Sequence, residues 1–162
     1  MDSPLQLEGF HIKRLSVAEN PAYVEQTDFE GNLTIEPEVM VHRSEANRYI
    51  LALRIGWHPK SGAEARLPYD VDVEGEAFYR LEEPCDLDDK EMGRLLLLNG
   101  SAILFGLLRA QVAQVTALGV NGMVLLPPVN LVDALRRRLQ TKRRRTRNQA
   151  STVATPPEAP SG

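Results

Sequence analysis

The sequence predicts an α+β fold, in which a four-stranded antiparallel sheet is followed by a long helix and a shorter C-terminal helix. Apolar and polar residues alternate through much of the first half, as they do in half-buried strands. The second half instead carries a nearly continuous apolar segment at 95–108, which we interpret as a helix. The 162 residues suit one domain, expected over 1–140, followed by a basic and then Pro/Ser/Thr-rich disordered tail over 141–162.

Four runs in the first half have the alternation of strands. In the first of them, the pattern breaks between Ile12 and Leu15, which predicts a bulge or a change of register. In the second, Pro37 cannot donate to a sheet ladder, which favours an edge strand or a bulge. The connection 20–31 contains aromatic residues, which is unusual for a plain solvent loop. The four runs span 10–17, 33–41, 49–57 and 67–76.

The acidic residues of 86–89 offer N-caps for the long helix, and their charge suits a helix start. Asn99-Gly100-Ser101 interrupts the apolar segment and predicts a kink. Gly119 is the expected end of this helix. An extended apolar segment, 120–128, follows and closes on two prolines, after which Asn130 caps the final helix.

The helix over 95–108 is apolar on nearly every side, so it must be covered on every side. The sheet covers one side, and the short final helix covers part of another. A chain of this size has little else to offer, so we expect a second subunit to cover the rest. The predicted homo-oligomer packs through Leu97, Leu104, Phe105 and Leu108.

The net charge of −3 hides a strong asymmetry. Residues 1–91 carry 20 acidic and 9 basic side chains, whereas the run 136–147 carries eight basic and no acidic ones. This run could bind nucleic acid or another acidic surface, or it could be a solvated helix end. No aromatic residues interleave with it, so base stacking is not expected.

Four carboxylates share one face of the fourth predicted strand. Taken alone, this pattern indicates a solvated face that deters aggregation. The functional alternative is a docking face for a basic partner, where charge complementarity sets the rate and specificity of binding. A flat strand does not wrap an ion, so no metal site is predicted. The four residues are Asp70, Asp72, Glu74 and Glu76.

The sequence contains no motif of a nucleotide-binding, metalloprotease or serine-hydrolase site, so we do not expect an enzyme. His11, His42 and His58 have no ligand-spaced partners. Cys85 is the single cysteine and lies in acidic surroundings that would raise a thiol pKa, so a catalytic role is not expected. No cofactor is predicted.

No targeting segment is visible at the N-terminus. The uncharged stretch 110–132 contains glutamines, glycines and two prolines, which makes it a poor membrane span. The expected location is therefore the cytoplasm, without membrane insertion.

Residues 101–135, SAILFGLLRAQVAQVTALGVNGMVLLPPVNLVDAL, resemble the SecB protein-export chaperone family, which includes the SecB-like chaperones of toxin–antitoxin systems. In that family, a helix entered through an "ilFPyaRe" pattern is followed by a "G-x-x-x-L-x-P-V-N" segment and a final helix. Gly106 replaces the family's proline, and the basic run 136–147 departs from the usual tail. The matching residues are Ile103, Leu104, Phe105, Arg109, Gly122, Leu126, Pro128, Val129, Asn130 and Leu135.

The resemblance implies a homotetramer, assembled as a dimer of dimers, that uses neither ATP nor a metal. Such a protein holds unfolded polypeptides in apolar grooves, either as preproteins kept export-competent for the SecA motor or as one antitoxin. It also implies that the acidic strand face lies near the region that docks SecA. The implied client groove consists of Tyr23, Val24, Phe29, Leu33, Ile35, Phe78, Val124, Leu126 and Leu131.

Two hypotheses follow for function. The first is an ATP-independent holdase whose partners are unfolded clients. The second is a nucleic-acid-associated regulatory protein that acts through 136–147, which is disfavoured because the run lacks aromatic residues.

Overall fold

The structure is a computed structural model that describes residues 4–25, 28–41, 47–60, 66–82 and 87–134. The chain divides after Pro128 into two compact units, which are treated separately below. The first unit contains the sheet and the long helix, and the described part of the second is a short segment at 129–134.

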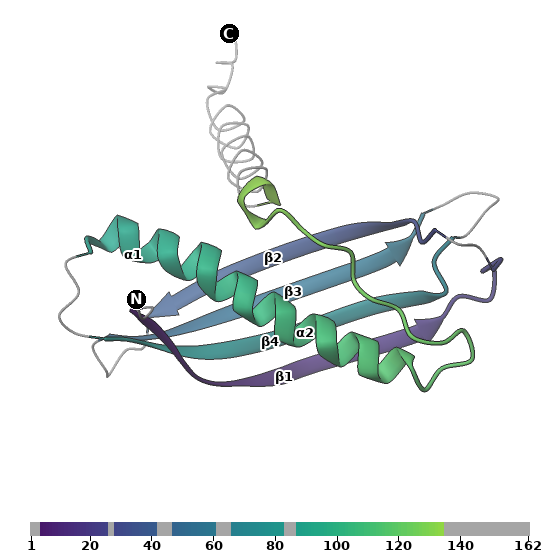
Figure 1. Ribbon diagram of the computed structural model, residues 1–162, viewed down its shortest axis with the longest axis horizontal. Coiled ribbons are helices and arrows are strands. Elements are labelled where there is room, and N and C mark those ends of the chain that lie inside the picture. The colour runs from purple at the N-terminus through teal and green to yellow at the C-terminus, as the bar shows by residue number, and fades with distance from the viewer. Residues whose placement is uncertain (1–3, 26–27, 42–46, 61–65, 83–86, 135–162) are drawn as a thin grey trace, which may run out of the picture. The chain divides into compact units, whose positions relative to one another are not determined.

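Four strands form one antiparallel sheet in the order β1-β4-β3-β2 (Figure 1). Strands β2, β3 and β4 follow one another as a meander, and β1 lies on the far side of β4, which is a Greek-key order. Strands β1 and β2 are therefore the two edges, as Pro37 predicts for β2. The strands span β1 Leu5–Glu19, β2 Gly31–Val41, β3 Arg48–Pro59 and β4 Tyr69–Leu81.

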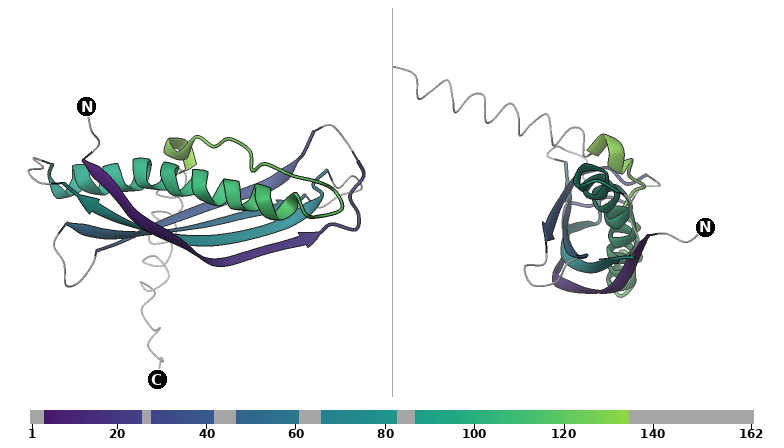
Figure 2. Two further views of the ribbon diagram at one scale, coloured as in Figure 1. Left: turned by 60° about the horizontal axis from the view of Figure 1, so that its bottom comes forward. Right: turned by 90° about the vertical axis from the view of Figure 1, so that its left-hand side faces the viewer.

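Alternation along β3 and β4 separates two faces of the sheet. The face that the helices cover, here called the inner face, is apolar, and the outer face is mainly polar (Figure 2). Each buried side chain on the inner face removes apolar area from water, which is the main favourable contribution to folding. The buried inner-face residues are Leu51, Leu53, Ile55, Trp57, Tyr69, Val71, Val73, Ala77, Tyr79 and Leu81.

Strand β1 contains two register shifts against β4, one between Leu7 and Gly9 and one between Ile12 and Arg14. The second shift confirms the break of alternation expected after Ile12. Each shift inserts one residue, so the inner-face positions change phase along the strand. The extra residue at the first shift is Glu8.

The long helical segment begins with a capping box. The carboxylate of Asp88 accepts from the backbone N–H of Glu91 at 2.7 Å, and the Glu91 carboxylate accepts from the N–H of Asp88 at 3.2 Å. These bonds satisfy two donors that a helix start leaves free. The segment comprises α1 Asp89–Leu95, the π-helical turn η1 Leu96–Gly100 and α2 Ser101–Thr116.

The predicted kink at 99–101 takes the form of the π-helical turn η1. Gly100 lies close to the sheet, where an added Cβ would come 3.2 Å from Leu51 and 3.3 Å from the ring of Tyr79. The hydroxyl of Tyr79 donates to the Gly100 carbonyl at 2.7 Å, which satisfies a carbonyl at the irregular turn. Glycine thus allows the helix to approach the sheet at this point.

Only one side of α2 packs on the sheet, where it lies over β4, β1 and β3. The helical stretch Asp89–Thr116 is long and apolar enough to cross a membrane by length and composition alone. A core helix of a soluble protein passes the same test, and the packed side of α2 has that character. The uncharged stretch 110–132 itself is not one helix, because α2 ends at Thr116.

After α2 the chain turns at 117–121 and returns as an extended segment, 122–128, here called the return segment (Figure 1); the first two residues of the predicted extended stretch 120–128 thus belong to the turn. The buried hydroxyl of Thr116 accepts from the N–H of Val124 at 3.0 Å, and the hydroxyl of Tyr69 accepts from the N–H of Asn121 at 3.1 Å. These two side chains anchor the turn and the return segment, since they satisfy donors that have no sheet partner.

In the second unit, Asn130 caps a helical turn over 131–134. Its side-chain oxygen accepts from the N–H groups of Val132 at 3.1 Å and Asp133 at 3.3 Å. This confirms the predicted cap of the final helix. The predicted continuation of that helix beyond residue 134, the basic run 136–147 and the tail 141–162 lie outside the described residues.

Candidate functional site

Among the described residues of the first unit, several large apolar side chains are exposed on α2 and beyond it. This exposed apolar surface begins on the side of α2 that faces away from the sheet, where Ile103 is 41% exposed and Val115 is 39% exposed. It continues through the turn after α2, where Leu118 and Val120 are the most exposed large apolar side chains. Between Arg94 and Asp133, the sequence carries one charged residue, Arg109. Exposed apolar side chains in such number are typical of surfaces that bind a protein or another apolar partner.

The return segment has one buried and one exposed row. Val124 and Leu126 are 1% and 0% exposed, whereas Met123 and Leu125 are 58% and 50% exposed. Predicted groove residues Val124 and Leu126 therefore lie in the core of the unit. The exposed neighbours Met123 and Leu125 are the ones available for binding.

The connection between β1 and β2 is held at its start by Asn20. Its amide donates to the Leu67 carbonyl at 2.8 Å, and its side-chain oxygen accepts from the N–H of Ala22 at 3.1 Å. Farther along, Val24 is exposed, and Phe29 is 41% exposed with its ring edge-on to Trp57 at a centroid distance of 6.5 Å. These predicted groove residues are accessible, and Tyr23 is half-buried.

The remaining predicted groove residues lie on different faces or in the second unit. Leu33 and Ile35 pair with Trp57 and Ile55 on the inner face, and both are half-buried. Phe78 lies opposite Ile50 on the outer face instead, because the alternation of β4 continues unbroken from Asp70. A groove on the inner face therefore cannot include Phe78, which corrects the predicted set of groove residues. Leu131 belongs to the second unit.

The predicted oligomer interface is largely occupied within one chain. Leu104 and Leu108 are fully buried against the chain's own sheet, and Phe105 is 8% exposed, whereas Leu97 is half-buried. The helix, which is apolar on nearly every side, therefore has a core side that packs on the sheet and an open side. The open side carries Ala102, Ile103, Gly106 and Ala110.

The acidic residues of β4 lie together on the outer face, as predicted, but basic residues of neighbouring strands accompany them. The Lys13 amine is 2.7 Å from Glu76, and the Arg54 guanidinium is 3.1 Å from Glu74. The hydrogen bond to Glu76 raises the pKa of Lys13 above its usual value. The face is therefore a lattice of cross-strand ion pairs rather than a bare acidic surface.

His58 lies beside Asp70 and Asp72 on the same face, with one ligand atom of each within 4.8 Å of the others. Nδ1 of His58 is 2.5 Å from Asp70, whereas Nε2 is 3.9 Å from Asp72. The two carboxylates thus approach opposite nitrogens of the His58 ring. A single metal ion can bind only one of these two nitrogens. The arrangement is that of a hydrogen-bonded surface pair of His58 and Asp70.

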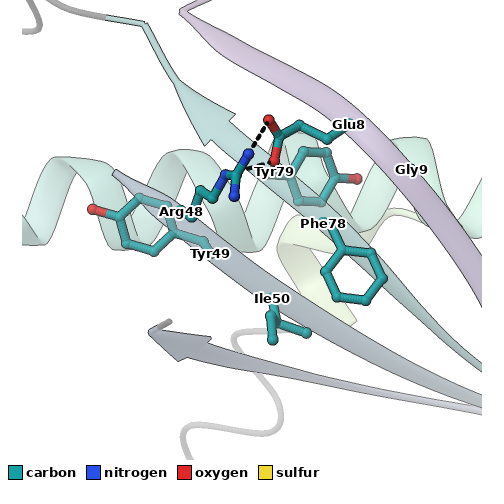
Figure 3. Close-up of a pocket in the computed structure, with 7 residues that line it drawn as sticks. All are labelled: Glu8, Gly9, Arg48, Tyr49, Ile50, Phe78 and Tyr79. Atoms are coloured by element: carbon teal, nitrogen blue, oxygen red, sulfur yellow. Dashed lines mark hydrogen bonds and ion pairs between the residues drawn. The ribbon is translucent and has the colours of Figure 1, made fainter. Parts of the chain in front are cut away.

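A hollow of about 260 Å³ opens at the other end of the outer face (Figure 3). Its polar wall is Glu8, the extra residue of β1, which binds Arg48 at 3.0 Å and Arg80 at 2.6 Å. The apolar wall consists of Ile50 and Phe78, so Phe78 is part of a surface hollow away from the helices. Both charges of the hollow are paired, which leaves its apolar wall as the accessible part.

Two polar atoms of α2 are buried without a hydrogen-bond partner among the residues that the structure describes. Ser101 is fully buried with an unbonded hydroxyl, and Nε of Arg109 is buried with no acceptor. An unsatisfied buried donor costs about 1 to 3 kcal/mol. Sequence reasoning did not single out Thr116 or Tyr69, and it named Arg109 only as a residue that matches the family pattern, although Arg109 is the single charged residue between residues 95 and 132.

No family model matches the chain. The uncharacterized protein MJ0357 of Methanocaldococcus jannaschii is 25% identical over 146 residues, which covers 90% of this chain and 91% of that protein. A protein of unknown function from Streptococcus agalactiae superposes with a TM-score of 0.42, covering 76% of this chain and 97% of that one, at 12% identity.

A second solved structure is more similar. It is the Mycobacterium tuberculosis SecB-like chaperone Rv1957, in complex with a ChAD peptide from the HigA1 antitoxin Rv1956. The TM-score is 0.61 at 15% identity, covering 78% of this chain and 91% of that chain. The sheet followed by a long helix is therefore a SecB-like fold, which confirms the fold and the resemblance expected from the sequence.

Proposed function

We propose that this protein is a chaperone that binds non-native polypeptides and holds them without ATP. The SecB-like fold supports this proposal, because a chaperone of that fold holds a peptide of an antitoxin. The observation that carries it is the apolar surface formed by the open side of α2 and the exposed row of the return segment.

The physical basis is that a holdase must bind chains that share no sequence. Burial of apolar area is non-directional, so an uncovered surface carrying Ile103, Met123 and Leu125 can accept many side chains. The two sheet edges, β1 and β2, can add hydrogen bonds to the client backbone, which every polypeptide offers. Together these interactions favour unfolded clients over folded proteins.

The same proposal includes self-association through the open side of α2. Ala102, Gly106 and Ala110 are exposed and spaced four residues apart, which lets a second helix approach closely. An added Cβ at Gly106 would have nothing within 4 Å in its own chain. A homotetramer would place this row against sister copies and leave Ile103, which is beside the row, and the return segment to clients.

Two client classes remain within the proposal, namely preproteins delivered to SecA and a single antitoxin. For SecA, the candidate docking surface is the outer face around Asp70, Asp72, Glu74 and Glu76. Because Lys13 and Arg54 pair with Glu76 and Glu74, we expect only weak electrostatic attraction of a basic partner there.

The test is suppression of aggregation of a chemically unfolded client, without nucleotide. We expect full protection at one tetramer per client, and protection lost in Ile103→Glu and in Leu125→Asp. Asn32→Glu is the matched control, since it adds the same charge on the outer face of β2 and should keep protection. No protection by the wild type at a several-fold excess would overturn the proposal.

A truncated chain that lacks 136–162 separates this function from a nucleic-acid role. A holdase keeps its client affinity after that deletion, because the apolar surface lies within the first unit. Loss of client binding, together with salt-dependent binding of nucleic acid by the full chain, would favour the alternative.

A further inference from the structure

A row of apolar side chains crosses the outer face of the sheet at the end where Glu8 lies. Met40 of β2 lies opposite Ile50 of β3, and Ile50 lies opposite Phe78 of β4. Gly9 of β1 lies opposite Phe78 at the end of this row, where an added Cβ would have nothing within 4 Å. Met40 is exposed, and Ile50 and Phe78 are half-buried. The long helix covers the other face, so within the described first unit no helix covers this apolar row (Figure 2).

The rows on either side of the apolar row are charged. Toward the middle of the sheet, Glu38 and Glu76 occupy the corresponding positions of β2 and β4. Toward the end of the sheet, Arg48 and Arg80 lie opposite each other on β3 and β4. Apolar side chains rimmed by charged residues are typical of the surface at which another protein binds.

The hollow beside the apolar row has the size of one inserted side chain. Its volume is about 260 Å³, and Ile50 and Phe78 form its apolar wall (Figure 3). Pockets for small organic ligands are larger, at roughly 300 to 1,000 Å³. At protein interfaces, by contrast, a few side chains that fill such pockets contribute most of the binding energy. The size of the hollow therefore favours an anchor residue from another protein over a free small molecule.

The polar wall of the hollow indicates the charge of the partner. The single carboxylate of Glu8 binds both Arg48 at 3.0 Å and Arg80 at 2.6 Å, so two guanidinium groups share one anion beside the apolar wall. The side chain of Arg80 is exposed, and a guanidinium has five N–H groups, so those that Glu8 does not use can reach a second acceptor. Charge complementarity therefore favours a carboxylate next to the anchor residue, which a guanidinium binds through two parallel hydrogen bonds.

From these features we infer that the hollow is a docking site for a partner protein that inserts one apolar side chain and carries an Asp or a Glu beside it. The site lies on the outer face of the sheet, whereas the proposed client surface lies on α2 and the return segment. The inference thus goes beyond the proposed chaperone function and does not depend on it. The site also differs from the end of the outer face around Asp70 and Asp72, whose charge suits a basic partner.

The experiment uses the full chain and fluorescent peptides of Gly and Ser that carry a central Phe-Asp pair. Two twin peptides carry Phe-Asn or Ala-Asp at the same place. We expect the wild-type chain to bind the Phe-Asp peptide roughly tenfold more tightly than either twin. Phe78→Ala should abolish the preference for Phe over Ala, and Arg80→Gln should abolish the preference for Asp over Asn.

Two control variants carry comparable changes elsewhere. Arg54→Gln removes another exposed arginine of the outer face, and Leu125→Asp alters the proposed client surface. Both should keep the wild-type affinities for all three peptides. Arg80→Gln changes an exposed side chain, so the variant folds and tests the inference even if Phe78→Ala does not fold.

Each other outcome overturns the inference in a distinct way. Equal binding of the three peptides by the wild type, or binding of none, would refute the docking site and leave the chaperone function standing. A preference for Asp that persists in Arg80→Gln would assign the carboxylate to another residue. Loss of binding in Leu125→Asp would show that the peptides occupy the client surface. A light-scattering mass of Phe78→Ala below that of the wild type would show that a second copy of this chain covers the apolar row.

Discussion

On the side of α2 that faces the sheet, Leu104 and Leu108 are fully buried, whereas Ile103 on the opposite side is 41% exposed. The return segment repeats this contrast, with Val124 and Leu126 buried beside exposed Met123 and Leu125. Both sides carry large apolar residues. Apolar composition therefore does not distinguish the side of α2 that stabilises the fold from the side that is open to a partner. Substitutions of neighbouring residues, one on each side, can distinguish the two.

The largest expected contrast is between Leu104→Glu and Ile103→Glu. Leu104→Glu buries an unpaired charge under the sheet and should destabilise the protein by more than about 4 kcal/mol, which leaves it unfolded. Ile103→Glu should change the free energy of unfolding by no more than about 0.5 kcal/mol while it removes client protection. Circular dichroism in a denaturant series gives both values, and a wild-type midpoint for Leu104→Glu would contradict the core position.

A second contrast lies in the return segment. Leu126→Ala should cost about 2 to 5 kcal/mol, because it leaves a cavity in the core. Leu125→Asp should leave the thermal midpoint close to the wild type and weaken client binding several-fold. Thermal melts and peptide titrations on the same samples test the pair. Equal loss of stability in both variants would mean that the exposed row also belongs to the fold.

The buried hydroxyl of Tyr79 provides a pH-dependent test of the inner face. Burial raises the pKa of Tyr79 from 10.0 to about 12. Between these values the unfolded chain loses the phenolic proton first, so the free energy of unfolding falls as pH rises. Tyr79→Phe should lack this fall and, below pH 10, should be less stable by about 1 to 3 kcal/mol, since the Gly100 carbonyl loses its donor.

The Tyr79 prediction is checked by denaturant melts of both proteins at several pH values. Identical slopes above pH 10 would show that Tyr79 is not the group responsible.

The smallest effect is expected on the outer face. Glu74→Gln removes the exposed ion pair with Arg54, which should cost at most about 1 kcal/mol. The difference from the wild type should shrink further in 1 M salt, because screening weakens surface pairs. Urea denaturation at low and high salt measures this difference in the free energy of unfolding. A loss of stability as large as that of Leu126→Ala would contradict the prediction and show that the outer face contributes strongly to stability.

Much of the sheet was predictable from the sequence, since alternation depends on neighbours along one strand. The break after Ile12, the edge position of Pro37 and the cap at Asn130 all follow from local rules, and the structure confirms them. The groove residues were harder to predict, because they depend on what covers each side chain. Val124 and Leu126 lie in the core, and Phe78 lies on the outer face away from Leu33.

The sequence by itself determined the order of the strands and helices, because side-chain period and capping are local properties of the chain. Only the tertiary structure decided which side of an evenly apolar helix meets the sheet, and which of two adjacent apolar residues in the return segment is buried. The physical reason is that burial of apolar area is non-directional, so the outcome depends on partners that are distant in sequence. The same reason left the Nε of Arg109 without an acceptor among the described residues, a feature visible only once its surroundings are assembled.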